Sequence, residues 1–421
     1  MSSDYKLLRE DFIRGHNGST ASEVVAITCV NQLANLLLIA VLSLFPVLTE
    51  PNHLWIRYSI EFFIIMTPFI TCITILSDYI FFVYLAIISL TVIAIVLCFM
   101  RRQTKQIVVK DLLELCPNYE QRLPFLTNLF STLMQCVCIA ILAVDFRVFS
   151  RRFAKTEIYG FSLMDVGVGS FIAINGGFSP ESRLGSDSRN KRMFLFKKTV
   201  FSTVPLIVLG FQRLIAVKSL EYHEHVTEYG VHWNFFFTLG LSKICLNCGL
   251  SEFIQNDNRN GLFAANKEGI LSLFGYISLY LIFVEIGKYI VNLNDTYIES
   301  TSRREMNLSF VFWMVSLNSL FIGMEFAIQT LVHCLQHLNV LGSGDTHRSI
   351  IFSAIGYSGM LLFLVSNLLT GLINFTINTI SVSNSIAFAI IVIYSLILSI
   401  ISVILFHYKI QIKIPVKQKS D

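Results

Sequence analysis

Residues 79–100 read YIFFVYLAIISLTVIAIVLCFM and contain no charged side chain. A helix needs about 20 apolar residues to cross a hydrocarbon core about 30 Å thick, and apolar runs of that order recur from residue 24 almost to the end of the chain. Of the 421 residues, 54% are hydrophobic and 14% are charged, whereas soluble domains carry about 25% charged residues. The composition predicts an all-α polytopic membrane protein with short loops and no soluble domain.

The apolar runs predict about eleven transmembrane helices, within a range of about 10–13. The predicted spans are residues 24–44, 58–77, 79–100, 124–144, 162–177, 197–217, 231–250, 267–290, 306–330, 349–378 and 385–407. The span at 162–177 is short and rich in glycine. Residues 331–341, LVHCLQHLNVL, are apolar but carry two histidines, a pattern that favours a segment lying along the membrane interface.

Lysine and arginine are more frequent in one set of alternate loops than in the other, and the richer set should face the cytoplasm. This bias predicts a lumenal N-terminal segment, residues 1–23, a single transmembrane domain, residues 24–408, and a cytosolic basic tail, residues 409–421. The tail ends KQKSD, with lysines three and five places from the end. It is similar to the dilysine retrieval signal of endoplasmic-reticulum membrane proteins, although a basic tail after a last span is also ordinary.

The stretch RRFAKTEIYGFSLMDVGVGSF, residues 151–171, places a carboxylate at the mouth of a predicted span. Asp165 has two interpretations: a helix N-terminal carboxylate that stabilises free backbone N–H groups, or a general base. Arg151, Arg152 and Lys155 lie in the adjoining loop on the same predicted side. A carboxylate beside three cations suits an anionic head group held next to a base, which favours the functional interpretation.

Three further polar clusters flank predicted spans. His232 and Asn234 stand at the start of one span, where histidine suits acid–base work but is also a common surface residue. Arg303 and Arg304 precede another span on the predicted lumenal side, against the usual charge bias, and guanidinium pairs bind phosphate. The third cluster consists of Asn367, Thr370 and Asn374, which recur on one helical face. This stripe predicts either helix–helix hydrogen bonds or the lining of a substrate groove.

Several stretches together resemble one family, the glucosaminyl-phosphatidylinositol inositol acyltransferases of GPI-anchor biosynthesis (the PIG-W family). The matching stretches are FIRGHNGSTASEV (12–24), AVDFRVFSRRFAKTEIYGFSLMDVGVGSF (143–171), TEYGVHWNFFFTLG (227–240), LFAANKEGILSLFGY (262–276), SRREMNLSFVFW (302–313) and SNLLTGLIN (366–374). RRFAKTE followed by MDVGVG and then VHWNFFFTL is a specific combination, and the resemblance runs from near the N-terminus to the penultimate span.

The resemblance implies an acyltransferase of the endoplasmic reticulum membrane that moves a fatty acyl chain, typically palmitoyl, from acyl-CoA to an inositol hydroxyl of glucosaminyl-phosphatidylinositol. It implies Lys155 and Asp165 as the catalytic pair. We assign Asp165 as the base, with His232 as the alternative, and Lys155 to the oxyanion or to a phosphate. The expected substrate-binding residues are Arg151, Arg152, Asn234, Asn266, Arg303, Arg304, Asn367 and Asn374. A thioester is already activated, so direct attack by the sugar alcohol needs a base and a group that stabilises the oxyanion.

Other features narrow the class. The chain has no GxSxG elbow, so a serine nucleophile has no support. The lone CxxC of Cys245 and Cys248 has no second pair, so no metal is predicted. The expected partners are acyl-CoA as co-substrate, the acceptor lipid and the membrane, with no further cofactor and no nucleic acid.

One alternative function and one departure from the family pattern stand beside the acyltransferase interpretation. A short glycine-interrupted span that carries a carboxylate also suits a secondary transporter or lipid flippase, but the chain shows one such span and no repeat. The family usually has about thirteen spans, and the connections on both sides of the stretch ANKEG, residues 265–269, look short for that pattern. The shortened connections leave the orientation of the span with Asn266 open.

Overall fold

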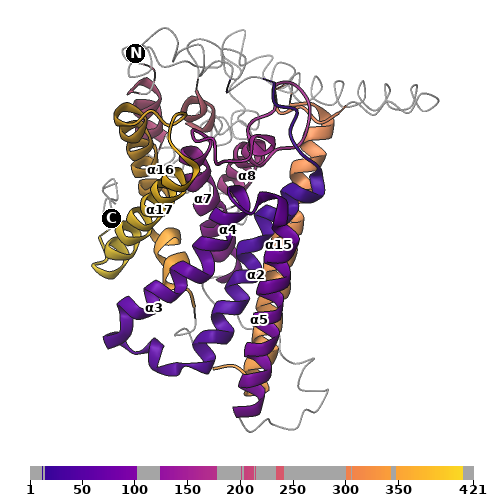
Figure 1. Ribbon diagram of the computed structural model, residues 1–421, viewed down its shortest axis with the longest axis vertical. Coiled ribbons are helices and arrows are strands. Elements are labelled where there is room, and N and C mark those ends of the chain that lie inside the picture. Colours follow the sequence, from indigo (N-terminus) through magenta and orange to yellow (C-terminus); the bar gives the residue numbers. More distant parts are fainter. Residues whose placement is uncertain are drawn as a thin grey trace, which may run out of the picture. The chain divides into compact units, whose positions relative to one another are not determined.

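The computed structural model describes residues 12, 15–101, 124–177, 201, 203–212, 214, 234–240, 300–304, 306–342 and 348–410 (Figure 1). Seven helical stretches in this part of the chain are long and apolar enough to cross a membrane. They are α2 (Ala21–Leu44), the stretch Pro51–Ile73 that includes α3 (Leu54–Glu61) and α4 (Thr67–Ile73), the stretch Ser77–Arg101 that includes α5 (Ile80–Arg101), α7 (Pro124–Ala143), α15 (Leu308–His337), α16 (Ile350–Thr376) and α17 (Asn384–His407). The predicted all-α polytopic membrane fold is confirmed.

Of the other four predicted spans, the structure describes one along its whole length, two in part and one not at all. The short span becomes α8 (Leu163–Gly177), which has 15 residues. The next two predicted spans are represented by the apolar helix Thr203–Gln212 and by helical residues 235–240. The predicted span 267–290 lies outside the described residues, so the count of eleven stays a prediction.

The chain divides into two compact units. The first contains Met1–Ser170 and Met314–Ile412, and the second contains Phe171–Trp313 and Lys413–Asp421. Within the first unit α2 packs against α4 and α5, while α16 packs against α7 and α17. Most of the residues that the sequence nominates for the site belong to this first unit.

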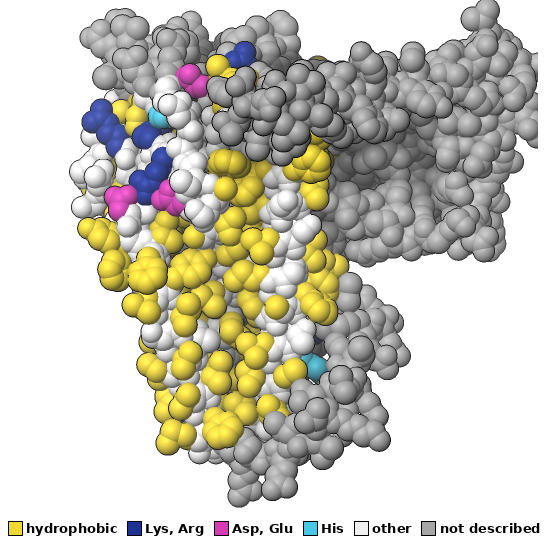
Figure 2. Space-filling view, turned by 90° about the vertical axis from the view of Figure 1, so that its right-hand side faces the viewer, with side chains coloured by type: hydrophobic (Ala, Val, Ile, Leu, Met, Phe, Trp, Pro, Cys, Tyr) yellow, Lys and Arg dark blue, Asp and Glu magenta, His cyan; other side chains and the backbone are white. Residues whose placement is uncertain are grey.

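The surface of the first unit fits a hydrocarbon environment. Large apolar side chains of α5 point outward, with Phe81 and Met100 73% and 76% exposed. Figure 2 shows hydrophobic side chains spread over the described surface, with lysine, arginine, aspartate and glutamate gathered toward its upper end. Because lipid tails are as apolar as these side chains, their exposure carries no penalty in a bilayer.

Small residues allow α16 to approach α7 closely. A Cβ at Gly356 would lie 2.8 Å from Cγ2 of Thr127, and a Cβ at Gly359 would lie 2.6 Å from a ring carbon of Phe130. Helices in membranes associate mainly through such close van der Waals contact. The glycines therefore fix the α7–α16 packing that places the ends of both helices together.

A proline accounts for the irregular middle of the span Pro51–Ile73. Between α3 and α4 the backbone forms a π-helical turn, Phe62–Met66, and Pro68 follows at the second position of α4. Proline donates no backbone hydrogen bond, and π-turns absorb this kind of mismatch within a helix.

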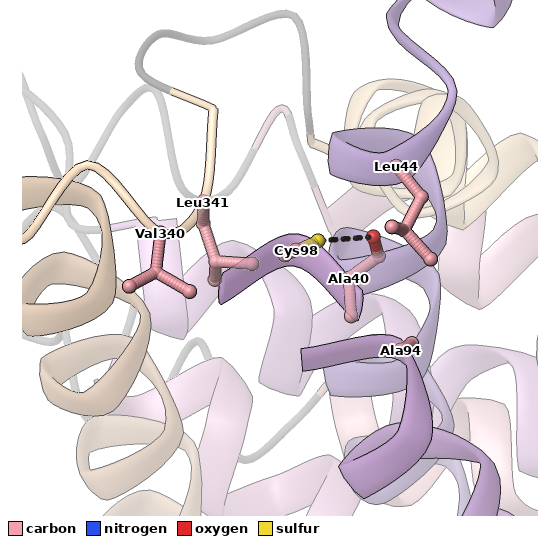
Figure 3. Close-up of a cluster of buried hydrophobic side chains, with 6 residues drawn as sticks. All are labelled: Ala40, Leu44, Ala94, Cys98, Val340 and Leu341. Carbon is pink, nitrogen blue, oxygen red and sulfur yellow. Dashed lines mark hydrogen bonds between the residues drawn. The ribbon is translucent and has the colours of Figure 1, made fainter. Parts of the chain in front are cut away.

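The segment 331–341 does not lie along the interface as its histidines suggest. Residues 331–337 continue α15 as one helix of 30 residues. The helix ends at His337, and Asn339 in the turn that follows has φ = 60°, a left-handed conformation that short polar residues tolerate. This turn brings Val340 and Leu341 against Ala40 and Leu44 of α2 and Ala94 and Cys98 of α5 (Figure 3). Because these apolar side chains are buried against protein, the predicted interfacial position of this segment is wrong.

A buried carboxylate joins the span Pro51–Ile73 to the start of α16. Glu61 is fully buried and accepts hydrogen bonds from Arg57 Nε (2.9 Å), Ser349 Oγ (2.9 Å) and the backbone N–H of Ile351 (3.1 Å). Arg57 also donates to the carbonyl of Arg348 at 2.5 Å. A buried charge is tolerated only when it is paired and hydrogen-bonded, and this site meets that condition.

Removal of one partner from this buried pair should destabilise the protein strongly. Arg57→Met leaves Glu61 buried without its cation, so we expect a loss of about 3–5 kcal/mol in unfolding free energy. The double variant Arg57→Met/Glu61→Leu should recover most of that loss, because no uncompensated charge remains. Thermal unfolding of the detergent-purified protein measures both, with Glu50→Gln, an exposed carboxylate, as control. Equal stability of Arg57→Met and the control would contradict the pairing.

Candidate functional site

The loop between α7 and α8 is held by Arg151. Its Nη2 donates to the carbonyl of Val144 at 2.7 Å, and its guanidinium lies 4.1 Å from the centre of the Phe12 ring. Burial lowers the pKa of Arg151 to about 10, and the negative charge of Asp145 opposes this shift. Arg151 therefore organises the loop through carbonyl and ring contacts.

The N-terminal segment crosses this loop through two glycines. The backbone N–H of Ser19 donates to the carbonyl of Phe161 at 2.6 Å, and the N–H of Glu157 donates to the carbonyl of His16 at 3.1 Å. Gly18 and Gly160 have φ of 79° and 131°, and a Cβ on either would collide with a backbone carbonyl of the other segment. Only glycine fits both the conformation and the space.

Asp165 is buried at the start of α8. It is 2% exposed, and its Oδ2 accepts hydrogen bonds from the Oγ1 of Thr156 at 2.6 Å and the N–H of Thr156 at 3.2 Å. The N–H of Asp165 in turn donates to Ser162 Oγ at 3.2 Å, the arrangement of a helix N-cap. Since Lys155 precedes Thr156, this bond fixes the cation-bearing loop to α8. The catalytic role of Asp165 stays a prediction.

The glycines after Asp165 bring neighbouring helices close to α8. A Cβ at Gly167 would lie 3.4 Å from Val137 of α7. A Cβ at Gly169 would lie 2.7 Å from side-chain atoms of Met314 on α15. Lys155 is partly buried, and its predicted role in oxyanion stabilisation or phosphate binding is untested.

Asp145 is a carboxylate at this end of the unit that sequence reasoning missed. Its Oδ2 accepts a hydrogen bond of 2.6 Å from Nδ2 of Asn374, which is 8% exposed, and its charge acts on Arg151. This hydrogen bond places Asn374 next to the loop between α7 and α8. A role of Asn374 in substrate binding requires that position. The available signal was a carboxylate at the last turn of a span, directly before a basic loop.

The rest of the predicted stripe on α16 has other partners. Thr370 Oγ1 lies 3.2 Å from the hydroxyl of Tyr394 on α17. Asn367 donates to the carbonyl of Phe363, one turn earlier on its own helix, at 2.7 Å. The stripe thus combines a helix–helix hydrogen bond, a local helix bond and one contact with the loop. Substrate binding by Asn367 stays a prediction.

Arg152 lies between two carboxylates. Its Nε donates to Glu23 Oε1 at 3.0 Å, and its Nη2 lies 2.7 Å from Asp78 Oδ1. Burial alone would lower the pKa of Arg152, but the hydrogen bonds to Glu23 and Asp78 outweigh it and raise the pKa above its usual value. The sequence predicts Arg152 as a ligand for an anion, but in the structure Arg152 is paired with two carboxylates.

Three nominated residues that the structure describes belong to the second unit. Asn234 Oδ1 accepts from the N–H groups of Phe236 and Phe237, and its Nδ2 donates to the carbonyl of Gly210 at 2.9 Å. Arg303 is 6% exposed and Arg304 is exposed. His232 and Asn266 lie outside the described residues, so their predicted roles are untested, and binding by the other three also stays a prediction.

An apolar cavity lies beside Asp165 in the first unit. It has a volume of about 50 Å³ and lies among α2, α7 and α8, where Thr28, Leu133, Val137, Ala140, Leu163 and Val166 contribute to its lining. Met164 and Val166, the two sequence neighbours of Asp165, are both part of this lining. Across the described residues, no group of three or more His, Cys, Asp and Glu side chains is placed to hold a metal ion. The predicted absence of a metal and of a further cofactor stays a prediction.

These features define a multi-pass membrane protein with a charged, loop-built site at one end of a helical unit. Comparison with known proteins identifies it further: the chain matches the GWT1 family model over residues 5–248, 241–297 and 290–405. It is 32% identical to the phosphatidylinositol-glycan biosynthesis class W protein of Dictyostelium discoideum, covering 98% of this chain and all of that one. It is 30% identical to GPI-anchored wall transfer protein 1 of Yarrowia lipolytica, again over 98% and 100%. The chain belongs to the GWT1 family, which confirms the resemblance to PIG-W proteins.

The family match breaks into three pieces that meet near residues 241–248 and 290–297. These junctions flank the ANKEG stretch, where the sequence suggests shortened connections. Both junctions lie outside the described residues, so the orientation of that span stays open.

Substitution at the crossing glycines should separate conformational strain from steric overlap. Gly18→Ala and Gly160→Ala combine a positive φ with a collision, so each should lower the unfolding free energy by about 1–3 kcal/mol. Gly15→Ala carries a similar φ of 80° with no atom within 4 Å of the new Cβ, so it should cost about 1 kcal/mol. Thermal unfolding gives the ranking, with Gly323→Ala in open helical space as control. A Gly15 variant as damaged as the other two would rule out the close crossing.

Proposed function

We propose that the chain transfers a fatty acyl group, typically palmitoyl, from acyl-CoA to an inositol hydroxyl of glucosaminyl-phosphatidylinositol during GPI-anchor biosynthesis. Family membership supports the pathway and the reaction class, since the two full-length relatives carry names that refer to phosphatidylinositol-glycan biosynthesis and to GPI anchors. The observation that carries the proposal is local. Thr156 binds Asp165, so the loop with Lys155 is fixed beside a helix that lines an apolar cavity.

The reaction needs four steps that balance. A base removes the proton of the inositol hydroxyl, and the oxygen attacks the thioester carbon. The resulting oxyanion is stabilised by a cation or N–H donor. The carbon–sulfur bond then breaks, and the coenzyme A thiolate leaves and takes up the proton. We assign Asp165 as base and Lys155 to the oxyanion or a phosphate, with His232 as the alternative base.

The geometry adds a second carboxylate to the choice of base. Asp165 is almost fully buried and bound twice by Thr156, which also suits a positioning residue. Asp145 is partly exposed and is bound by Asn374. A base must reach the hydroxyl directly or through one water. Substitution of each carboxylate distinguishes Asp165 from Asp145 as the base.

The proposed setting is the endoplasmic reticulum membrane, with a lumenal N-terminal segment 1–23, a transmembrane domain 24–408 and a cytosolic tail 409–421. The basic loop bias and the tail lysines support it. The family match gives no support to a function as transporter or flippase.

Replacement of the base should abolish transfer without loss of the fold. We expect Asp165→Asn to lower kcat at least about 10²-fold, and Lys155→Met to lower it as well through loss of a positive charge. The assay combines purified protein, labelled palmitoyl-CoA and glucosaminyl-phosphatidylinositol, with thermal unfolding as the check on folding. Thr156→Val is the matched variant, because it removes the bond to Asp165 but keeps the carboxylate.

The variants distinguish base from positioning residue. If Asp165 is the base, Thr156→Val keeps measurable turnover, and Asp145→Asn loses less than Asp165→Asn. If Asp165→Asn and Thr156→Val lose the same modest amount while Asp145→Asn is inactive, the base is Asp145 and our assignment is wrong. Wild-type protein that acylates no inositol lipid would overturn the function itself.

A further inference from the structure

A single carboxylate is buried inside the first unit, among α2, α7 and α15. Glu325 lies in the central part of α15 and is 1% exposed. Asn128 of α7 donates a hydrogen bond to its carboxylate, and its charge acts on Cys29 of α2. The three helices contain no lysine or arginine, and no ion pair within the described ranges includes Glu325. An ionised Glu325 therefore needs a positive charge from another source.

Other polar side chains on α2 and α7 are buried with unpartnered oxygen atoms. Asn31 Oδ1, Gln32 Oε1, Thr132 Oγ1, Gln135 Oε1 and Glu325 Oε1 have no hydrogen-bond partner in the part of the chain that the structure describes. All five side chains are at most 2% exposed. Buried polar atoms are nearly always paired, so five unpartnered oxygens in one bundle point to a ligand.

Two contacts turn the polar face of α2 toward α7 and α15. Gln32 Nε2 donates to the carbonyl of Phe321 at 3.4 Å, and Phe321 lies one turn before Glu325 on α15. Asn31 Nδ2 lies 3.6 Å from Sγ of Cys136 on α7. Each unpartnered amide oxygen is bonded to the same carbon atom as one of these nitrogens. The oxygens of Asn31 and Gln32 therefore also lie between the three helices.

The oxygens on α7 follow one another by helical turns. Asn128, Thr132 and Gln135 are spaced i, i+4 and i+7, so they share one face of the helix, and Asn128 binds Glu325. A rise of 1.5 Å per residue places Thr132 about 6 Å and Gln135 about 10 Å from the level of Asn128. Thr132 is thus within reach of a ligand on the Glu325 carboxylate, and Gln135 lies one turn farther.

Charge and donor type decide which ligand fits. Unpartnered acceptors outnumber the one unpartnered donor among these groups, Gln135 Nε2, so an acceptor-rich ligand does not match. One carboxylate balances one positive charge, and a divalent ion would leave a net charge of +1 buried in the bundle. Carboxylate and amide oxygens are the ligands of hard cations. These conditions favour a small monovalent cation such as Na⁺.

We propose that α2, α7 and α15 enclose a site for a monovalent cation. The ion binds the Glu325 carboxylate, Gln32 Oε1 and Thr132 Oγ1, one ligand from each helix. Asn31 and Gln135 accept hydrogen bonds from water that the ion retains. The ion neutralises Glu325 and holds the three helices together, and this role does not depend on the proposed acyl transfer.

Thermal unfolding of the full detergent-purified chain tests the site. Na⁺ replaces choline, a cation too large for the site, at constant ionic strength. The Tm of the wild type should rise by about 2–4 °C and then saturate, because the ion binds only the folded state. Glu325→Gln should have the same Tm in both salts. Glu50→Gln, which changes an exposed carboxylate beyond the end of α2, should keep the wild-type response.

Binding of radioactive sodium to the same preparations gives a second measurement. Thr132→Val keeps the shape of the side chain but removes one ligand, so it should raise Kd about 5-fold, and it also tests the site if Glu325→Gln does not fold. Wild-type Kd in both variants overturns the inference, because the ion then binds elsewhere. Equal Tm of the wild type in Na⁺ and choline, without sodium binding, overturns it too, since a proton then neutralises Glu325.

Discussion

The candidate site depends on the crossing of two backbone segments at one end of the first helical unit. Residues 16–19 meet residues 157–161 through backbone hydrogen bonds, and glycine is required on both sides of the contact. This crossing, together with the bond from Thr156 to Asp165, gives the loop after α7 a fixed course. A loop without such ties would not hold a cation and a carboxylate at one position, and catalysis by positioning requires that precision.

The apolar bundle imposes a second constraint, because polar groups inside it must find partners. Glu61 meets the constraint by binding Arg57 and the start of α16, and Tyr394 meets it by donating toward the carbonyls of Cys138 and Ser366. The contacts of Glu61 with Ile351 and of Tyr394 with Cys138 join segments that are 290 and 256 residues apart in sequence. They also hold α16 in the register that brings Asn374 to Asp145.

Hydropathy was sufficient to predict the seven long helices, since each needs only its own residues to satisfy its backbone. The sequence also showed that Asp165 opens a helix, because the capping pattern is local. It could not show which carboxylate faces which cation. The pairing of Arg152 with Glu23 and Asp78 joins three separate segments, and no period or spacing encodes such a contact. The burial of Val340 and Leu341 could not be predicted for the same reason, because it depends on contacts with α2 and α5.

The contacts of Arg151 and Arg152 change the functional interpretation of the basic loop. In the sequence, Arg151, Arg152 and Lys155 read as one positive patch for an anionic head group. In the structure Arg151 is largely occupied with backbone carbonyls and the Phe12 ring, and Arg152 is balanced by two acids. The field at the loop is thus weaker and more divided than a count of cations suggests.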